Sequence, residues 1–284
     1  MSAHEVPAEG ATQPGDGSGP SGNGTEPILR VEGISKRFGA VVALRGVDLQ
    51  LNAGEVLGLV GDNGAGKSTL VKIICGFHQP DSGRIFLEGR QVHFRSVEDA
   101  RRHGIDTVYQ DLALVPQLPI YYNLFLGREL TFGGPLRLLS QHRMRRLSER
   151  YLDDIQVSIP DINAEVETLS GGQRQAVAVA RAPRSQVKVL LLDEPLAAMG
   201  AKESSLIIDL IKGLAARGQA MIVIDHNYTH MFELCDRLNI IEQGVVSLDT
   251  KVADTSIEEL TSYMVSQYRK QVTTGREELS EAGR

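Results

Sequence analysis

The chain has 284 residues, 42% of them hydrophobic, with no tryptophan, a net charge of −6 and an isoelectric point near 5.7. Such an acidic chain lacks the general basic surface with which proteins bind nucleic acids, and none of its stretches approaches the roughly 18 consecutive apolar residues of a bilayer-spanning helix. Its cysteines, Cys75 and Cys235, are too few for a disulfide framework, so we expect the reduced, buried thiols of a cytosolic protein.

The first residues differ in composition from the rest. Residues 1–26 are rich in Gly, Pro, Ser, Thr and Glu and hold too few apolar side chains to offset the entropy cost of ordering, which predicts a disordered tail. This tail also lacks the apolar core of a secretory signal. After it, residues 28–32, 43–51 and 84–92 have the composition of strands, and we expect them to form an antiparallel layer.

A glycine-rich segment between an apolar run and a helical pattern carries the strongest functional signal. Residues 56–60 predict a buried strand, residues 61–69 read Gly-Asp-Asn-Gly-Ala-Gly-Lys-Ser-Thr, and helical periodicity then continues to Gly76. Strand, tight loop and helix in this order are the context of a phosphate-binding P-loop. The sequence therefore predicts a nucleoside triphosphate site at this loop.

The P-loop residues have separate predicted roles. Glycines allow the backbone to curl until its N–H groups point at phosphate oxygens, and the helix N-terminus adds its dipole. We expect Lys67 to reach the β- and γ-phosphates, and the hydroxyl of Ser68 to ligate Mg²⁺, which prefers oxygen ligands. The predicted nucleotide contacts of this segment are Gly61, Asn63, Gly64, Gly66, Lys67, Ser68 and Thr69.

The apolar run 187–192 is followed directly by Asp193 and Glu194. A run this apolar suits a strand buried on both faces of a parallel sheet, and ligands bind at the carboxyl ends of such strands. We expect Asp193 to hold the Mg²⁺ shell and Glu194 to orient or deprotonate the attacking water. The alternative, a merely polar strand exit, is disfavoured because a P-loop is also present.

His226 and Gln110 are candidates because each follows a predicted strand. A histidine after the run 220–224 is either a structural residue or a γ-phosphate contact, and its position at the same end of the sheet as Asp193 favours the contact. Gln110 closes the predicted strand 106–109, and its amide can offer an oxygen to Mg²⁺ or water and its NH₂ to a phosphate. The loop after Gln110 would couple the nucleotide to the next segment.

A second glycine-rich segment, Leu169-Ser170-Gly171-Gly172-Gln173, precedes a helical pattern over residues 174–182. Locally it is a capping box, in which Ser170 and Gln173 exchange hydrogen bonds with each other's backbone. Glycines inside a helix cost about 0.8–1.0 kcal/mol each, so a cap alone does not explain two of them. Bare backbone at a helix N-terminus suits a closely approaching phosphate. Because the P-loop already holds one phosphate chain, we expect this phosphate to be bound by another subunit.

The order and spacing of these motifs resemble the nucleotide-binding subunit of ATP-binding cassette (ABC) transporters over residues 28–249. The resemblance implies an α/β fold, with a P-loop NTPase core around a mostly parallel sheet, an antiparallel β layer and a helical subdomain over about 112–168. It also implies that two subunits clasp two ATP molecules head to tail, each between one P-loop and the partner's signature segment, residues 169–173. The chain holds one copy of each motif, so the pair is a homodimer or this chain with a related one.

The resemblance also assigns single residues. It places Phe38 against adenine, where the family usually has Tyr, and Phe keeps the ring face needed for stacking. Residues 197–200 read Ala-Ala-Met-Gly and lack the carboxylate with which many relatives contact the partner subunit. Asp225 precedes His226 where Ser is common, and its carboxylate either orients the imidazole or points to solvent.

Stretches between the motifs resemble bacterial importers of ribose, xylose, fructose and similar sugars. These stretches are residues 108–116, 123–129, 173–181 and 197–200. The resemblance implies a peripheral ATPase on the cytoplasmic face of the inner membrane, with integral permease subunits and, indirectly, an external sugar-binding protein, but no nucleic acid. The alternative is a soluble ABC-type ATPase acting on nucleic acid or the ribosome, yet residues 112–168 lack the heptads of a coiled-coil insertion. Glu194 and His226 disfavour a binding module with little turnover.

Weaker patterns complete the prediction. Ser140 is an expected N-cap for a helix over residues 143–155, and Gln243-Gly244 an expected turn in a hairpin over residues 240–248. The predicted organisation is a disordered tail (1–26), an ABC ATPase domain (27–250), and a C-terminal helix (256–268) followed by a loose end (273–284) within residues 251–284.

Overall fold

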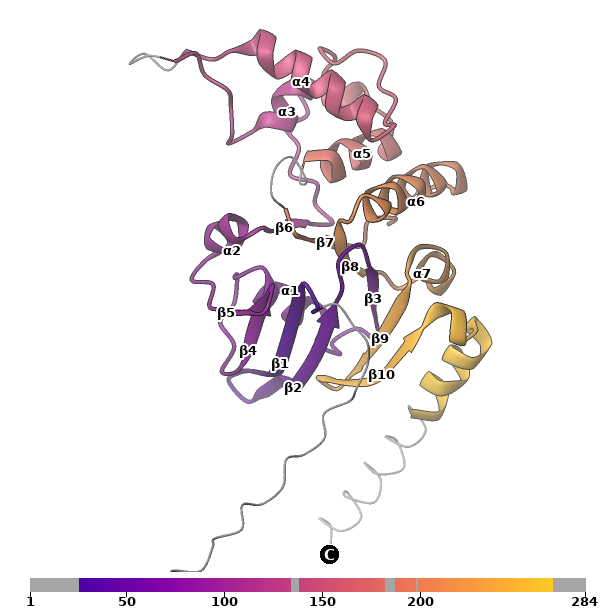
Figure 1. Ribbon diagram of the computed structural model, residues 1–284. Helices are drawn as coiled ribbons and strands as arrows, with labels where there is room; N and C mark the ends of the chain where they lie inside the picture. The colour runs from indigo at the N-terminus through magenta and orange to yellow at the C-terminus, as the bar shows by residue number, and fades with distance from the viewer. Residues whose placement is uncertain (1–25, 134–137, 182–186, 198, 268–284) are drawn as a thin grey trace, which may run out of the picture.

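The computed structural model describes residues 26–133, 138–181, 187–197 and 199–267, and Figure 1 shows their arrangement. The predicted disordered tail, apart from Glu26, and the predicted loose end over residues 273–284 lie outside the described residues. Two sheets form the lower part of Figure 1, and helices gather in the upper part.

The larger sheet positions the candidate site. Within the described residues it has six strands in the order β10-β9-β3-β8-β7-β6. These are β3 (Val56–Val60), β6 (Ile105–Val108), β7 (Val189–Asp193), β8 (Ala220–Ile224), β9 (Arg237–Glu242) and β10 (Val245–Lys251). All neighbours pair in parallel except β10, which forms an antiparallel hairpin with β9. The α/β class with a mostly parallel core sheet is thus confirmed.

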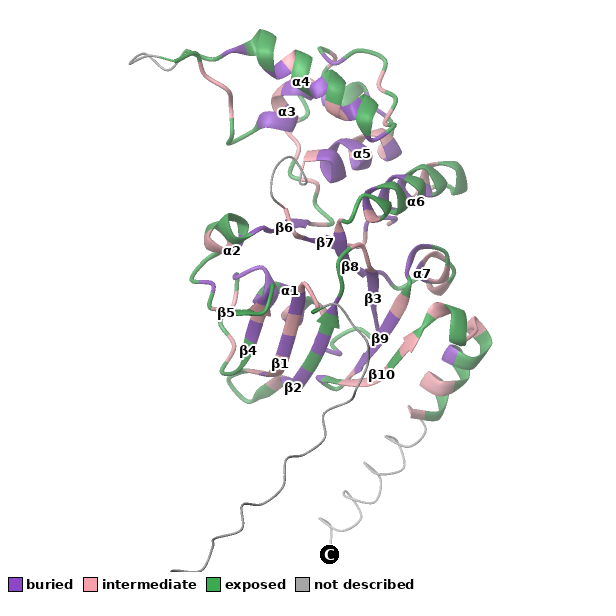
Figure 2. Cartoon of the chain, in the orientation of Figure 1, coloured by how far each residue is buried: buried purple, intermediate pink, exposed green. Residues whose placement is uncertain are grey.

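The parallel strands of this sheet are almost entirely buried, as their apolar runs predict, whereas β10 at its edge has no buried residue. In β7, Val189 and Leu191 pack into one hydrophobic cluster, whereas Leu190 and Leu192 pack into the other. The first cluster includes helix α1 (Lys67–Ile74) and the smaller sheet, and the second includes the helices on the opposite face. Figure 2 shows these strands as mostly buried. Both faces of β7 are therefore buried, and its polar residue, Asp193, stands at the end of the strand.

The smaller sheet is antiparallel, as predicted, with the order β2-β1-β4-β5 among the described strands. Its strands are β1 (Leu29–Phe38), β2 (Val41–Leu51), β4 (Ser82–Leu87) and β5 (Arg90–Val92). Leu29 pairs with Leu51 on one side and with Leu87 on the other, so buried side chains of three strands meet over the core. Strand β1 continues to Phe38 rather than ending at the predicted residue 32.

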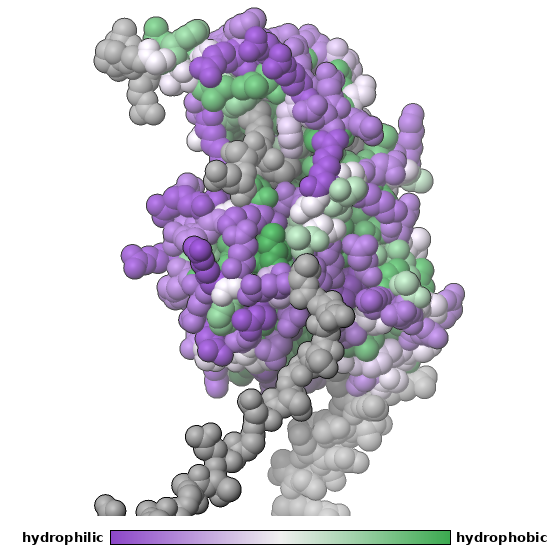
Figure 3. Space-filling model, viewed as in Figure 1, coloured by the Kyte–Doolittle hydropathy of each residue, from purple (hydrophilic) through white to green (hydrophobic). Residues whose placement is uncertain are grey.

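The remaining helices pack on both faces of the core sheet: the first of them in chain order packs with α1 in the first cluster, and the others contribute to the second. Several of these later helices form the upper part of Figure 1. The remaining helices are α2 (Val97–His103), α3 (Ile120–Phe125), α4 (Gln141–Asp154), α5 (Gly171–Arg181), α6 (Ala201–Ala216) and α7 (Tyr228–Leu234), with short 3-10 turns at Val166–Thr168 and Val252–Asp254. Residues 257–267 are also helical. None of the helices within the described residues is long and apolar enough to cross a membrane, and the face seen in Figure 3 is mostly hydrophilic, with hydrophobic residues in scattered groups.

Two details of the helical region differ from prediction. The helix predicted over residues 143–155 begins at Gln141 and Ser140 is its N-cap, but the Ser140 hydroxyl makes no capping hydrogen bond and is buried without a hydrogen-bond partner among the described residues. Residues 112–168 are also less helical than their pattern suggests. Pro116, Pro119 and Pro160 interrupt the helical periodicity there, since proline is tolerated at a helix start but not in its interior.

The cysteines are free and buried, as expected. Cys75 ends helix α1, and Cys235 follows α7. Burial, reinforced by the charges of Asp236 and Asp225, raises the pKa of the Cys235 thiol. A thiol of this kind behaves as a small apolar side chain and is unreactive.

Arg237 ties the two sheets together. Its Nε lies 2.6 Å from Glu55 Oε1, its Nη1 lies 2.8 Å from Asp249 Oδ2, and its Nη2 donates to the backbone oxygen of Gln50 at 2.5 Å. Burial favours the neutral form, but the hydrogen bonds and charges of Glu55 and Asp249 outweigh it and raise the pKa of Arg237. The side chains of Arg237 and Glu55 are 15% and 11% exposed. Removing either one would therefore leave the charge of the other poorly solvated and without its partner.

We expect Arg237→Met to lower the free energy of unfolding by roughly 3 kcal/mol, because it leaves the Glu55 carboxylate buried without its partner. Thermal and urea unfolding measure this loss. Arg84→Met is the matched control, since the Arg84 side chain is 60% exposed beside Glu32 and an exposed pair is worth about 1 kcal/mol or less. Equal effects of the two substitutions would show that the Arg237 contacts add nothing beyond a surface pair.

Candidate active site

The P-loop runs from the end of β3 into α1, which begins at Lys67 as predicted. Gly61 has a φ of 145°, and a Cβ there would lie 2.1 Å from the carbonyl oxygen of Ile241 in β9. Gly66 has a φ of 112°, and its Cβ would lie 2.7 Å from the carbonyl oxygen of Ala43 in β2. Both positions require glycine because the loop packs directly against neighbouring backbone, a reason beyond the phosphate approach that the sequence predicts.

Lys67 lies within the curl of this loop. Its Nζ donates to the carbonyl oxygens of Gly61 at 2.5 Å and Asp62 at 2.9 Å. Burial lowers the pKa of Lys67, against the opposing influence of the Asp62, Glu194 and Asp193 charges. A half-buried ammonium of this kind gains from any further anion that comes within reach.

The loop forms one wall of a cavity of about 340 Å³. The cavity is lined by Phe38, Val41, Val42, Ala43, Asn63, Gly64, Ala65, Gly66, Lys67, Ser68, Thr69, Asp193, Glu194, Ile224, Asp225 and His226. Segments far apart in sequence therefore meet around one space. Of the predicted site residues, Gly61, Gln110 and the signature segment do not line it.

The parallel register explains this meeting. Leu59 of β3 pairs with Ile224 of β8, and Asp193 of β7 pairs with the same Ile224. The carboxyl ends of these three neighbouring strands therefore lie at one edge of the sheet, where ligands bind in such folds. The polar residues that follow each strand are brought to that edge by the pairing itself.

Asp193 and Glu194 stand side by side at this edge. Burial first, and the Glu194 charge second, raise the pKa of Asp193, while Lys72 and Lys67 oppose the shift. Glu194 has a φ of 49°, which costs a non-glycine residue about 1–3 kcal/mol. The carbonyl oxygen of Ile224 helps to hold it there, since it accepts a hydrogen bond from the Glu194 N–H at 2.8 Å. Strain of this kind is concentrated at functional sites.

The donor set at this edge suits a divalent cation. The half-buried Asp193 carboxylate and the Ser68 hydroxyl both line the cavity, and both are the oxygen ligands that Mg²⁺ prefers. Within the described residues, no cluster of three or more His, Cys, Asp or Glu could hold a metal by itself. Mg²⁺ is commonly held by one or two carboxylates together with substrate phosphates, so these two residues fit a metal that arrives with a nucleotide.

His226 reaches the cavity from the loop after β8. Its Nδ1 lies 3.5 Å from Glu194 Oε1 and 3.8 Å from Asp225 Oδ1, and its side chain is 71% exposed. Asp225 itself is only 3% exposed. Of the two predicted alternatives for Asp225, the solvent-facing one is therefore wrong, and its carboxylate lies beside the imidazole.

Gln110 lies just beyond β6, at the same edge of the sheet, and is exposed. The loop that follows is held from behind by the last residue of α5, because Arg181 donates to the carbonyl oxygens of Ala113 at 2.7 Å and Leu112 at 3.1 Å. Asn123 of α3 also bonds the loop, accepting from and donating to the backbone of Val115. The sequence did not predict these anchors, which connect the loop after Gln110 to the helix that begins at the signature segment.

The capping box of the signature segment is confirmed. The Ser170 hydroxyl accepts from the Gln173 N–H at 3.2 Å, and the Gln173 side chain accepts from the Ser170 N–H at 3.0 Å. The N–H of Gly172 donates to Glu203 of α6 at 3.4 Å, and a Cβ on Gly172 would lie 3.0 Å from the Glu203 Cβ. Close packing of α6 thus gives Gly172 a structural reason to be glycine, and Glu203 is a neighbour of the signature segment that no sequence motif indicated.

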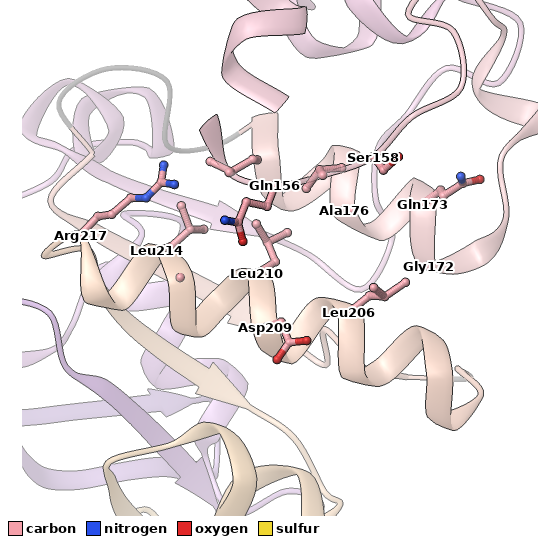
Figure 4. Close-up of a pocket in the computed structure, with 13 residues that line it drawn as sticks. Gln156, Ser158, Gly172, Gln173, Ala176, Leu206, Asp209, Leu210, Leu214 and Arg217 are labelled. Atoms are coloured by element: carbon pink, nitrogen blue, oxygen red, sulfur yellow. The ribbon is translucent and has the colours of Figure 1, made fainter. Parts of the chain in front are cut away.

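Gly172 and Gln173 line a different cavity, of about 410 Å³, between α5 and α6. Figure 4 shows both residues at one end of it, with Leu206 and Asp209 of α6 opposite them. Figure 1 likewise places α5 among the helices of the upper part, away from α1 and the P-loop. The signature segment of this chain therefore stands apart from the P-loop cavity of the same chain.

Phe38 ends β1 at the rim of the P-loop cavity and is 44% exposed. The His78 ring meets it edge-on, with ring centroids 5.2 Å apart, and Lys36 Nζ lies 5.6 Å from the centre of the Phe38 ring. The ring is thus held in place from its sides while part of it stays accessible, which is compatible with stacking on a flat base.

Comparison with known proteins identifies similar proteins over most of the chain. Residues 44–197 match the family described as ABC transporter. A xylose/arabinose import ATP-binding protein (XylG) from Sulfolobus acidocaldarius is 48% identical over 84% of this chain and 94% of its own length. A fructose import ATP-binding protein (FrcA) from Rhizobium meliloti is 47% identical over 77% of this chain and 86% of its own length. A ribose import ATP-binding protein (RbsA) from Burkholderia mallei is 42% identical over 84% of this chain, but the match covers 46% of that longer protein.

Solved structures with the same fold are also similar. An ATP-binding cassette of an ABC transporter in its ADP conformation has a TM-score of 0.74 at 25% identity, covering 88% of this chain and 100% of that one. A dimeric cassette in a post-hydrolysis state, bound to ADP and phosphate, has a TM-score of 0.65 at 25% identity, covering 79% of this chain and 99% of that one.

Proposed function

We propose that this chain, which belongs to the ABC transporter family and is an ATP-binding-cassette ATPase, drives the uptake of a small sugar through partner membrane subunits. One observation carries the ATPase chemistry: the P-loop, Asp193, Glu194 and His226 converge on a single cavity. The sugar is inferred from relatives named as sugar import proteins whose own lengths are almost fully matched.

The residues around the cavity divide the work of phosphoryl transfer. Lys67 and the loop N–H groups bind the β- and γ-phosphates, and Phe38 stacks on the adenine. Ser68 and Asp193 would hold Mg²⁺, which when bound neutralises charge on the phosphates. Glu194 orients the attacking water and accepts its proton, and His226 contacts the γ-phosphate from the end of the neighbouring strand β8. Gln110, at the same sheet edge, couples the bound nucleotide to the loop that follows it.

The signature segment acts on a second subunit. Ser170, Gly171, Gly172 and Gln173 stand at the N-terminus of α5, and the positive end of a helix dipole is a natural anion site. Since they lie apart from their own P-loop cavity, we infer that they cap the ATP of a partner, in a homodimer or a pair with a related chain. The dimeric cassette structure among the similar folds supports this arrangement.

The partners follow from the same inference. Residues that would touch a sugar are not needed in this chain, because integral permease subunits carry the cargo and an external sugar-binding protein delivers it to them. The ATPase would then sit peripherally on the cytoplasmic face of the membrane, where ATP is available. Domain limits of 27–250 for the ATPase, with a helical subdomain over about 112–168, are part of this proposal.

Uptake measurements test the proposed cargo. In a strain lacking this gene, we expect uptake of at least one of radiolabelled xylose, arabinose, fructose or ribose to be lost, and to return with the natural chain but not with Lys67→Ala. Unchanged uptake of all four sugars would contradict the sugar assignment.

The alternative function and our proposal differ in what should stimulate ATP hydrolysis. The soluble alternative predicts that DNA, RNA or ribosomes stimulate ATP hydrolysis, whereas our proposal predicts stimulation by a co-expressed permease in lipid vesicles. Stimulation by nucleic acid and none by a permease would favour the alternative.

A further inference from the structure

A buried carboxylate stands directly behind His226. Asp225 follows the last residue of β8 and is 3% exposed. Its Oδ1 accepts from the N–H of Asn227 at 2.9 Å, and its Oδ2, within the described residues, has no hydrogen-bond partner. A buried carboxylate with so few hydrogen bonds is costly unless a positive or proton-donating group stands beside it.

Two imidazoles occupy that position. His226 Nδ1 lies 3.8 Å from Asp225 Oδ1, and His230 Nδ1 lies 3.8 Å from Asp225 Oδ2. His230 Nδ1 is itself buried and unpartnered among the described residues. The two unsatisfied atoms, Asp225 Oδ2 and His230 Nδ1, therefore face each other, and a small side-chain rotation would bring them to hydrogen-bond distance.

The backbone around Asp225 fixes this geometry. Asn227 is the N-cap of α7, and its side chain accepts from the N–H groups of Thr229 at 3.0 Å and His230 at 3.4 Å. One turn further on, Met231 is completely buried in the core. The backbone from Asp225 to His230 is thus held at both ends, which fixes the positions from which the carboxylate and both rings extend.

The surroundings of His226 decide which ring nitrogen is available to a substrate. Nδ1 faces two carboxylates, Glu194 at 3.5 Å and Asp225 at 3.8 Å. A nitrogen between two acceptors carries a proton, and the hydrogen bond at one ring nitrogen determines the role of the other. Nε2 is then left for the γ-phosphate. Contacts of this length commonly tighten when the substrate is bound.

We infer that Asp225 is a positioning residue for ATP hydrolysis: its carboxylate, paired with His230 on one side, holds the His226 ring with Nδ1 inward and Nε2 toward the γ-phosphate. The inference rests on the proposed function, because it requires His226 to act on that phosphate. It assigns Asp225 to the mechanism rather than to the fold alone, and it makes His230 the hydrogen-bonding neighbour of the buried carboxylate.

Single and double substitutions test the inference in the full-length chain with MgATP. Asp225→Asn and His230→Gln should each lower kcat by roughly ten- to a hundred-fold, the range typical of removing the outer partner of a metal-bound histidine, with KM for ATP within about two-fold. In a His226→Ala background, Asp225→Asn should cause no further loss. Glu233→Gln, on the exposed side of α7, is the matched control and should keep the parental rate.

Two kinetic outcomes would overturn the inference: an unchanged kcat in Asp225→Asn, or a loss of the same size with and without His226, which indicates a structural role. If both His226→Ala and Glu194→Gln hydrolysed ATP at the parental rate, the proposed ATPase site itself would be refuted. A measurement on the natural chain avoids any folding defect. Nitrogen NMR of the histidine rings should show a proton on His226 Nδ1, and an unprotonated Nδ1 would refute the positioning role.

Discussion

Glu194→Gln should bind ATP as well as the natural chain and hydrolyse it at least about a hundred-fold more slowly, the usual loss when a general base is removed. Gln keeps the size and polarity of Glu, so neither the cavity wall nor the left-handed backbone at this position changes. What disappears is the carboxylate that accepts a proton from the attacking water. The Glu194–His226 contact of 3.5 Å also loses its charge, which adds to the loss.

The consequence for assembly follows from the same change. If ATP is capped by the partner's signature segment, slow hydrolysis leaves the capped state populated, so Glu194→Gln with MgATP should elute as a dimer. ADP should leave it monomeric. Single-turnover phosphate release, ATP titration and light scattering measure the three quantities. Glu149→Gln, exposed on α4, is the control and should behave as the natural chain, while a parental hydrolysis rate in Glu194→Gln would show that another group activates the water.

The site at the sheet edge could be predicted from sequence because it depends on local patterns. Each apolar run marks a strand, and each strand exit marks the place where a polar side chain leaves the core. Parallel pairing then brings Asp193 and His226 together without any further information. The P-loop adds a loop conformation that only its glycines permit.

Contacts made by tertiary packing could not be predicted in this way. Burial of Asp225 depends on His230 and on α7, a helix of seven residues whose pattern is too short to stand out. Contact of Glu203 with Gly172 depends on how α6 packs on α5. The glycine requirement at Gly61 arises from the carbonyl of Ile241 in a strand far along the chain. In each case the partner is distant in sequence, and no spacing rule connects the two.

Lys67→Ala should weaken ATP binding by roughly ten- to a hundred-fold, because charged hydrogen bonds to phosphate are worth about 1.5–3 kcal/mol. The Lys67 ammonium is desolvated by the loop, and burial lowers its pKa. The N–H groups of the Lys67 ammonium that do not bond the loop are stabilised by a nearby anion. The contribution of Lys67 to phosphate binding is therefore larger than that of a surface lysine. Isothermal titration with a non-hydrolysable ATP analogue measures the affinity.

Thermal unfolding separates binding from folding in the same variant. A ligand at about a hundred times its Kd stabilises a protein by about 2.7 kcal/mol, so ATP should raise the unfolding temperature of the natural chain and raise that of Lys67→Ala much less. Without nucleotide the two should unfold alike, since the substitution removes a half-buried charge along with its hydrogen bonds to Gly61 and Asp62. Lys72→Ala, exposed on the same helix, should keep both the affinity and the ATP-induced shift. If Lys67→Ala bound ATP as tightly as that control, the loop would hold phosphate by its backbone alone, and the ammonium would have no part in binding.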